Sequence, residues 1–316
     1  MKYIESFREG EKVTGVYLCK AKASAVTKNG KPYESAILQD KTGTVDAKIW
    51  DPGSQGIDDF DPLDYVDIVA DVIVFNGVTQ LNVKRIRKVR EGEYDPKDYL
   101  PVSEKDIDEM YEELKKYIAS VKDKYLSILL NRFFIEDKEF SQSFKAHSAA
   151  KSVHHGFIGG LLEHTLSVVK LCNFYTTLYP MLNRDLLITA AMLHDVGKID
   201  EIEEFPVNDY TDDGNLLGHI VIGSEKIGRM ADTIEDFPRQ LRSQLQHCIL
   251  AHHGQLEYGS PKKPALMEAW ALYYADDTDA KLETMKELFS GINIQDNGKW
   301  IGYNKRLETN LRRTDW

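Results

Sequence analysis

The chain has 316 residues, a formal net charge of −11 at pH 7 and 42% hydrophobic residues, a composition typical of a soluble globular protein with room for two domains. Its start, "MKYIESFREGEKV", is charged throughout and no segment is long and apolar enough to span a bilayer. We therefore expect a cytoplasmic protein with no signal peptide and no membrane partner. The three cysteines, Cys19, Cys172 and Cys248, are far apart and form no CxxC pair, so neither a disulfide framework nor a zinc knuckle is indicated.

The negative charge is unevenly distributed along the chain. Residues 1–90 contain 14 Lys+Arg and 13 Asp+Glu, so the acidic excess lies in the remainder. Phosphate contacts drive nucleic-acid binding, and a net negative charge therefore opposes it. Bound cations would neutralise part of the acidic excess.

Residues 1–90 alternate between apolar and polar side chains as strands do. Turn signals, among them Asn76-Gly77, separate five strand-like runs at 11–23, 33–40, 44–51, 65–75 and 79–89. Five short strands in under a hundred residues predict a small closed β-barrel, most simply an OB-fold. An SH3-like barrel or an open meander would give the same strand count.

The remainder is predicted to be a linker, an all-α domain and a tail, so the chain as a whole is multi-domain. Residues 91–104 are polar, carry two prolines and have no period, as a linker does. Residues 105–290 have a helical period and predict an all-α domain. Helices are expected at 106–121, 125–134, 159–178, 185–198, 218–232, 238–253 and 264–289. Residues 291–316 form a tail of mixed basic and aromatic residues.

The apolar helical run at 185–198 stops on His194 and Asp195 in "LHDVGK". Burying a charged pair costs several kcal/mol unless it is compensated. A salt bridge, a helix cap or a metal ion would each compensate the pair, and the dipeptide alone does not choose among them.

Other histidines and aspartates sit at similar places on neighbouring helices. They are His164 in "GGLLEHT", His219 in "GHIVIG", His252 and His253 in "LAHHG", and Asp276 and Asp277 in "YADDTDA". A lone buried histidine is usually a core residue, but each one needs its own hydrogen-bond partner. A metal centre accounts for all of them together. Imidazoles with carboxylates suit Mn, Fe, Co or Zn, and the order supplies enough ligands for two ions.

The set His164, His194-Asp195 and Asp276 resembles the signature of the HD phosphohydrolases, and His219 with His252 matches their two-metal subgroup. The match runs from about residue 150 to 285. With an OB-fold in front, the chain resembles the YhaM family of 3'→5' exoribonucleases over nearly its whole length. The resemblance implies a manganese-favouring, metal-dependent 3'→5' exonuclease in the cytoplasm, acting on single-stranded RNA in its processing or turnover, and also on single-stranded DNA.

The resemblance also implies roles for individual residues. His164, His194, Asp195 and Asp276 would hold one divalent ion, and Asp195 would bridge to a second ion held by His219 and His252. His253 can exchange roles with His252, and Asp277 with Asp276. Two ions per chain are expected, Mn²⁺ first, with Co²⁺ or Fe²⁺ as alternatives. A homo-oligomer is compatible with the family.

Further residues have both a functional and a plain structural interpretation. Lys198 would stabilise charge at the scissile phosphate, or else cap the helix that ends there. His154 and His155 would line the pocket or lie in solvent, whereas His147 and His247 are taken as structural or exposed. Nucleic-acid contacts are expected from a basic stripe on the last barrel strand and from the tail, where the alternatives are a solvated face and simple packing. These residues are Lys84, Arg85 and Arg87 in the stripe, and Arg306, Arg312 and Arg313 among Trp300, Tyr303 and Trp316 in the tail.

Two other functions compete with the exonuclease. One is a phosphohydrolase of free or cyclic nucleotides with a regulatory barrel. Its cyclic-di-GMP version is weakened because "QLEYGSPKKP" follows "HHG" where those hydrolases carry "ExxDGxGYP". The other is a non-catalytic single-strand-binding module, which is disfavoured because no ligand position is lost.

Overall fold

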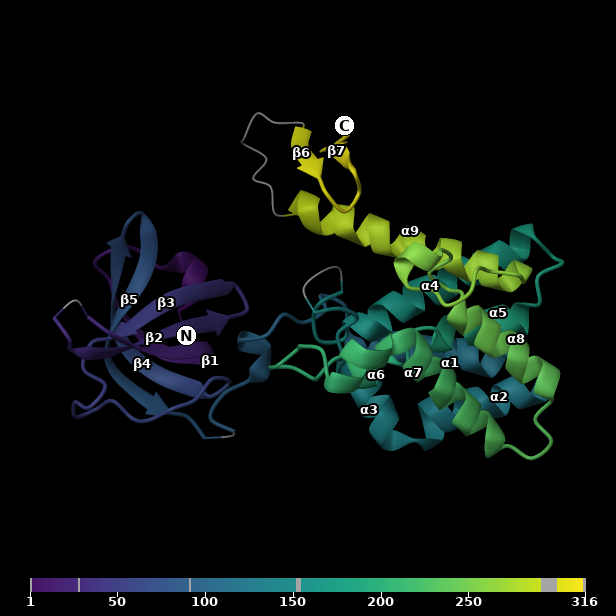
Figure 1. Cartoon of the computed structure of the whole chain (residues 1–316), viewed down its shortest axis with the longest axis horizontal. Helices are drawn as coiled ribbons and strands as arrows, with labels where there is room; N and C mark the ends of the chain where they lie inside the picture. Colours follow the sequence, from purple (N-terminus) through teal and green to yellow (C-terminus); the bar gives the residue numbers. More distant parts are fainter. Residues whose placement is uncertain (1, 28, 91, 152–154, 291–299, 315–316) are drawn as a thin grey trace. The chain divides into compact units, whose positions relative to one another are not determined.

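The computed structural model describes residues 2–27, 29–90, 92–151, 155–290 and 300–314. The chain divides into two compact units, Met1–Val102 and Ser103–Trp316. The first is a β-barrel and the second is built mainly of helices (Figure 1). Within the described residues, no helix combines the length and apolarity needed to cross a membrane. His154 and Trp316 lie outside the described residues.

The first unit is a closed five-stranded barrel with the strand order β1-β2-β3-β5-β4. All neighbouring strands are antiparallel except β3 and β5, which pair in parallel through Asp46 and Gln80. Alternate side chains of each strand fill the interior, as period-two patterning requires. The strands are β1 Lys12–Val26, β2 Pro32–Asp40, β3 Gly43–Ile49, β4 Tyr65–Phe75 and β5 Val78–Lys88. Five strands closed in this order make an OB-fold, as expected.

The segment predicted as a linker packs on the barrel over most of its length. Tyr94 stacks on Tyr65 with ring centroids 3.6 Å apart, and Tyr99 meets the same ring edge-on at 5.1 Å. Gln39 Nε2 donates to the carbonyl oxygen of Tyr99, and Leu100 is buried. The first unit therefore extends beyond residue 90, because Tyr94 and Tyr99 of this mostly polar segment pack against Tyr65 of β4.

The second unit contains helices around one continuous apolar core. They are α1 Ile107–Ser120, α2 Lys124–Asn131, α3 Lys138–Ala146, α4 Gly160–Leu178, α5 Arg184–Leu193, α6 Lys198–Glu201, α7 Asp212–Asp232, α8 Arg239–Leu250 and α9 Met267–Ser290. The sequence pattern missed α3 and the first turns of α7. In α7, the non-helical φ of +74° at Gly218 kinks the helix and interrupts its period.

The predicted helix at 185–198 is in fact two helices joined by a turn. Helix α5 ends at Leu193, His194 is its C-cap, and α6 begins at Lys198. Lys198 is therefore not the C-terminal cap of α5. The turn packs tightly on α7, since a Cβ added to Gly197 would lie 2.1 Å from the carbonyl oxygen of His219.

The described part of the tail forms a hairpin of β6 Trp300–Asn304 and β7 Thr309–Arg312. Asn304 Oδ1 accepts hydrogen bonds from the backbone N–H groups of Arg306 and Leu307, which closes the turn. The sequence indicated a basic and aromatic composition here but no hairpin.

The packing at Gly197 predicts that replacing this glycine by alanine destabilises the protein. Its φ of −68° and ψ of −19° are helical, a conformation in which alanine is ordinarily more stable than glycine by roughly 0.5–1 kcal/mol. We expect Gly197→Ala instead to lower the free energy of unfolding by about 1–3 kcal/mol, measured in urea, because the methyl group overlaps α7. Gly53→Ala, with no atom within 4 Å of its added Cβ, is the control. Wild-type stability in Gly197→Ala would contradict the packing.

Candidate metal centre

Five helices deliver histidines and aspartates to one point in the helical unit. Each residue comes from a helix or from the turn directly after one: His164 from α4, His194 and Asp195 from the end of α5, His219 from α7, His252 and His253 from the end of α8, and Asp276 from α9. All are buried or half-buried. The residues singled out in the sequence therefore lie together.

Asp195 lies between two groups of imidazoles. Its Oδ2 is 3.4 Å from His164 Nε2 and 3.3 Å from His194 Nε2. Its Oδ1 is 3.5 Å from His219 Nε2 and 3.7 Å from His252 Nε2. One carboxylate thus presents one oxygen to each group, which is the arrangement of a bridging ligand.

Around Asp195 the donor atoms fall into two clusters, each tight enough to hold one ion, and a third group, His155, His164 and Asp279, shares His164 with the first. His164, His194 and Asp276 place one donor atom each within 4.8 Å of one another, and His219, His252 and His253 do the same. Asp276 Oδ1 is 3.2 Å from His164 Nε2. The neighbouring Asp277 instead forms a 2.8 Å salt bridge with Lys281.

Every imidazole of the centre is oriented by a hydrogen bond at its Nδ1. His194 and His252 bond to the carbonyl oxygens of Ala191 and Ile249, at 2.8 and 2.7 Å. His253 bonds to the carbonyl oxygen of Tyr258 at 2.8 Å. His164 and His219 bond to carboxylates, those of Asp279 and Glu201. Occupied Nδ1 atoms leave the Nε2 atoms for a metal, as is usual at histidine-ligated sites.

The pKa directions favour the metal-binding forms of His252 and Asp195 and a cationic form of His164. Burial lowers the pKa of His252 well below its usual value, helped by His253 and His194, so the ring is neutral. Burial would raise the pKa of the Asp195 carboxyl, but Lys198 and His194 hold that pKa well below its usual range. Burial would lower the pKa of His164, yet hydrogen bonds to Asp276 and Asp279 raise it to about 10. A positive charge, proton or metal, is therefore favoured beside these carboxylates.

Three buried polar atoms of the centre have no hydrogen-bond partner among the described residues. They are Asp195 Oδ1, His219 Nε2 and His252 Nε2, and all three face one another. An unsatisfied buried polar atom costs about 1–3 kcal/mol. Nitrogen and oxygen donors without thiolates suit a catalytic divalent ion of the Mn, Fe, Co or Zn type. The residues therefore fit a divalent metal.

Lys198 lies against the carboxylate of Asp195. Its Nζ is 2.7 Å from Asp195 Oδ2. Burial would lower its pKa, but the charge of Asp195 raises that pKa above its ordinary value, so the side chain is an ammonium. Lys198 also lines the cavity over the centre and so brings a fixed positive charge to it.

Sequence reasoning missed two carboxylates that orient the ligands. Glu201 Oε1 accepts hydrogen bonds from both the backbone N–H and the Nδ1–H of His219, each at 2.9 Å. Asp279 Oδ2 lies 2.7 Å from His164 Nδ1 and 3.1 Å from His155 Nε2. Asp279 follows Asp276 by three residues, which is one helical turn on the same face, and that spacing was the available signal.

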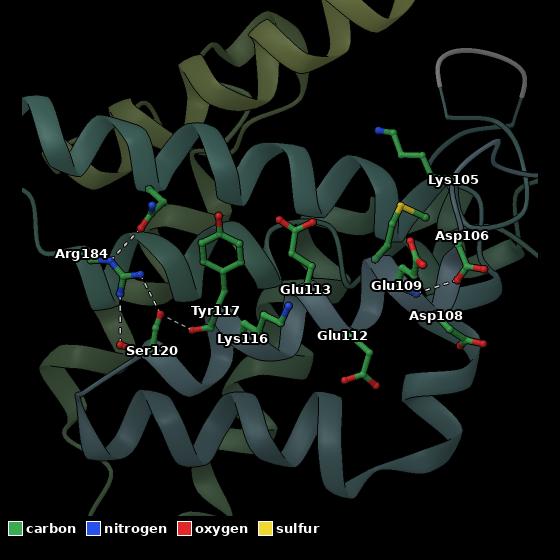
Figure 2. A pocket seen from close by; sticks show the side chains of 12 residues that line it. Lys105, Asp106, Asp108, Glu109, Glu112, Glu113, Lys116, Tyr117, Ser120 and Arg184 are labelled. Carbon is green, nitrogen blue, oxygen red and sulfur yellow. Dashed lines mark hydrogen bonds between the residues drawn. The ribbon is translucent and has the colours of Figure 1, made fainter.

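A cavity of about 650 Å³ opens over the centre. Lys198, Tyr258, Tyr273, Asp276 and the hairpin residue Arg306 are among the residues that line it. A larger hollow of about 990 Å³ runs along α1 and ends at Arg184 on α5 (Figure 2). Its described lining includes none of the histidines, so it is not the site of the chemistry.

The other predicted nucleic-acid residues are exposed. Strict alternation along β5 would put Lys84 and Arg87 on opposite faces. A bulge leaves Lys84 without a register partner in the β4 ladder and brings Lys84, Arg85 and Arg87 to the outer face. Lys84 pairs with Asp71, while Arg87 pairs with Asp67 and Glu93. Arg312 and Arg313, at the end of the hairpin, are also exposed.

The two histidines taken as structural lie outside the centre. His147 is buried and its ring nitrogens face the carbonyl oxygens of Ser148 and Ile202. His247 Nε2 accepts a hydrogen bond from the backbone of Ala265.

Known proteins are similar to this chain both in the helical unit and over most of its length. The HD domain family model matches residues 161–281. The chain is 36% identical over 277 residues to the 3'-5' exoribonuclease YhaM of Bacillus subtilis (strain 168), which covers 87% of each chain. It is 36% identical over 282 residues to the YhaM of Geobacillus sp. (strain WCH70), which covers 89% of this chain and 86% of that one.

A solution structure of the second OB-fold domain of replication protein A from Methanococcus maripaludis covers 29% of this chain and 98% of its own, with a TM-score of 0.23 and 15% identity. The assignment of the barrel rests instead on its closure and strand order. Since the two YhaM exoribonucleases match most of its length, the chain belongs to the family of YhaM 3'-5' exoribonucleases, and residues 161–281 of its helical unit are an HD domain.

Proposed function

We propose that this chain is a metal-dependent 3'→5' exonuclease that shortens single-stranded RNA, with single-stranded DNA as a second substrate. The observation that carries the proposal is the shared carboxylate of Asp195, which faces two clusters of metal-ligating donors. The names of its relatives, 3'-5' exoribonucleases, supply the direction and the RNA.

In this proposal His164, His194, Asp195 and Asp276 hold one divalent ion, and Asp195, His219 and His252 hold the second, with His253 beside it. Mn²⁺ is the first candidate, and Co²⁺ or Fe²⁺ are alternatives. Such a pair of ions supplies Lewis-acid stabilisation of the phosphoryl oxygens and activates the attacking water.

The chain's own residues bind and orient the phosphodiester. The Lys198 ammonium, fixed against Asp195, neutralises charge that develops on the scissile phosphate. Arg306 lines the same cavity from the hairpin and pairs with a phosphate of the strand. Arg312 and Arg313 lie further along the hairpin and contact the strand beyond the cavity.

In this proposal the barrel also binds the nucleic-acid strand, through Lys84, Arg85 and Arg87 on the outer face of β5. Carboxylates already pair with Lys84 and Arg87. Among the described residues no ion-pair partner is found for Arg85, so it is the stripe's readiest contact for a phosphate.

Purified protein with Mn²⁺ and a 5'-labelled oligoribonucleotide tests the function. A ladder of products shortened from the 3' end, with released mononucleotides, is expected. Hydrolysis of free or cyclic nucleotides alone would replace the proposal with a nucleotide phosphohydrolase. Binding without cleavage would indicate a single-strand-binding module.

Asp195→Asn should abolish hydrolysis and lower the Mn²⁺ content, because it removes the charge shared by both clusters. It also strands the buried ammonium of Lys198, so we expect a stability loss of roughly 3–5 kcal/mol. Adding Lys198→Met removes that stranded charge. The double variant should recover stability but no hydrolysis, measured by urea unfolding beside oligonucleotide turnover. Wild-type turnover in either variant would refute the bridging role.

Glu201→Ala should weaken one Mn²⁺ site about 10- to 100-fold and leave the other near wild type, because only His219 loses its anchor. Glu201→Gln keeps an acceptor oxygen and should recover part of the affinity. Mn²⁺ titration of metal-free protein measures this, with the exposed Glu203→Ala as a control. Equal weakening of both sites, or of neither, would contradict separate anchoring.

A further inference from the structure

Two aromatic residues line the cavity over the metal centre, and two more contact Tyr273 beside it. Trp270, Tyr273 and Tyr274 lie on α9, and Tyr258 lies in the short 3-10 helix Leu256–Tyr258. Tyr258 and Tyr273 line the cavity itself. Trp270 is 38% exposed, Tyr274 54% and Tyr258 64%. These four residues are called the aromatic platform below.

The rings on α9 contact one another and make one continuous surface. Tyr274 stacks on Trp270 with centroids 5.8 Å apart and planes 26° apart. Tyr273 lies 5.0 Å from Tyr274 and 6.1 Å from Trp270. Aromatic pairs at such separations hold each other in place. The cluster therefore offers preorganised ring surface at low entropic cost.

Two residues of the platform contact the turn that carries His252 and His253. An added Cβ on Gly254, directly after the ligand candidate His253, would lie 2.6 Å from the Tyr273 ring. That ring therefore rests on the turn that carries the histidines. The carbonyl oxygen of Tyr258 accepts the hydrogen bond from His253 Nδ1. Both tyrosines keep a fixed place beside the ligands.

The spacing along α9 sets the scale of the platform. Tyr273 precedes Asp276 by three residues and Trp270 precedes it by six, so successive side chains of the three are offset by about 60° around α9. At 1.5 Å per residue, Trp270 is about 9 Å along the axis from the aspartate. The platform thus begins where the cavity opens and continues for a distance on the scale of a few nucleotides.

We propose that the aromatic platform binds unpaired nucleobases of the strand next to the scissile phosphate, by stacking. This inference rests on the proposed exonuclease function. Every base has a π-face, so stacking suits an enzyme that must accept each nucleotide in turn. Continuity of the exposed rings with the catalytic cavity is what selects the substrate strand, rather than another protein, as the occupant.

The test compares KM values of the full-length protein for two oligonucleotides of equal length in Mn²⁺. One carries all its bases, and the other is abasic at the 3'-terminal positions. Loss of a stacking partner weakens binding by roughly five- to 150-fold per base. We expect Trp270→Ala and Tyr274→Ala to raise KM for the base-bearing strand by at least about fivefold, with kcat changed less than about twofold.

In the same variants, the ratio of KM for the abasic strand to KM for the base-bearing strand should be smaller than in the wild type. Trp270→Phe keeps an aromatic ring and should restore most of the wild-type KM. Tyr179→Ala removes a similarly exposed tyrosine, 54% exposed after α4, and serves as the matched control.

Failure of the inference and failure of the function give different results. If the wild type shortens neither strand, the exonuclease function is wrong. If the wild type shortens the strands but Trp270→Ala keeps its KM and its preference, the platform does not bind bases. Dissociation of an oligomer in Trp270→Ala with an unchanged KM would show that the rings pack between copies of this chain, and would overturn the inference.

Discussion

The helical unit is organised around one buried carboxylate, that of Asp195. A lone carboxylate at this depth would take up a proton. It stays charged because Lys198 lies 2.7 Å from one oxygen and four imidazoles surround the two oxygens. Those imidazoles come from four different helices, so the carboxylate fixes where those helices approach one another. The same carboxylate therefore stabilises the fold through its ion pair with Lys198 and belongs to the candidate metal centre.

Two helix ends orient their histidine rings in the same way. The last carbonyl groups of an α-helix have no partner within it. His194 at the end of α5 and His252 at the end of α8 each use the carbonyl oxygen three residues earlier to hold Nδ1. An apolar helical run that stops on histidine thus has a physical reason, because the run buries the helix end and a carbonyl of its last turn aims the ring. The two candidate ligands within helices, His164 in α4 and His219 directly after the kink in α7, are oriented by carboxylates instead.

The sequence predicted what depends on local pattern and missed what depends on distant contact. Alternation and the Asn76-Gly77 turn, with φ of +51° and +80°, predicted the strands of the barrel. The ligand candidates could be found because histidines at the ends of apolar runs are rare. Glu201 and Asp279 could not, since an acidic residue on a helix looks the same whether it faces solvent or an imidazole. The bulge at Lys84 and the break before Lys198 also went unpredicted, because each depends on a neighbouring strand or helix.

A chain with net charge −11 must bind a polyanion by means other than its overall field. Long-range attraction is absent and exposed charges are screened within about 8–10 Å at physiological salt. Local positive groups at the cavity are few, and Lys281 among them is already paired with Asp277. On the barrel, carboxylates likewise neutralise most of the basic stripe. Stacking does not depend on charge, so the proposed aromatic platform beside a site that fits divalent cations would reconcile an acidic protein with a nucleic-acid substrate.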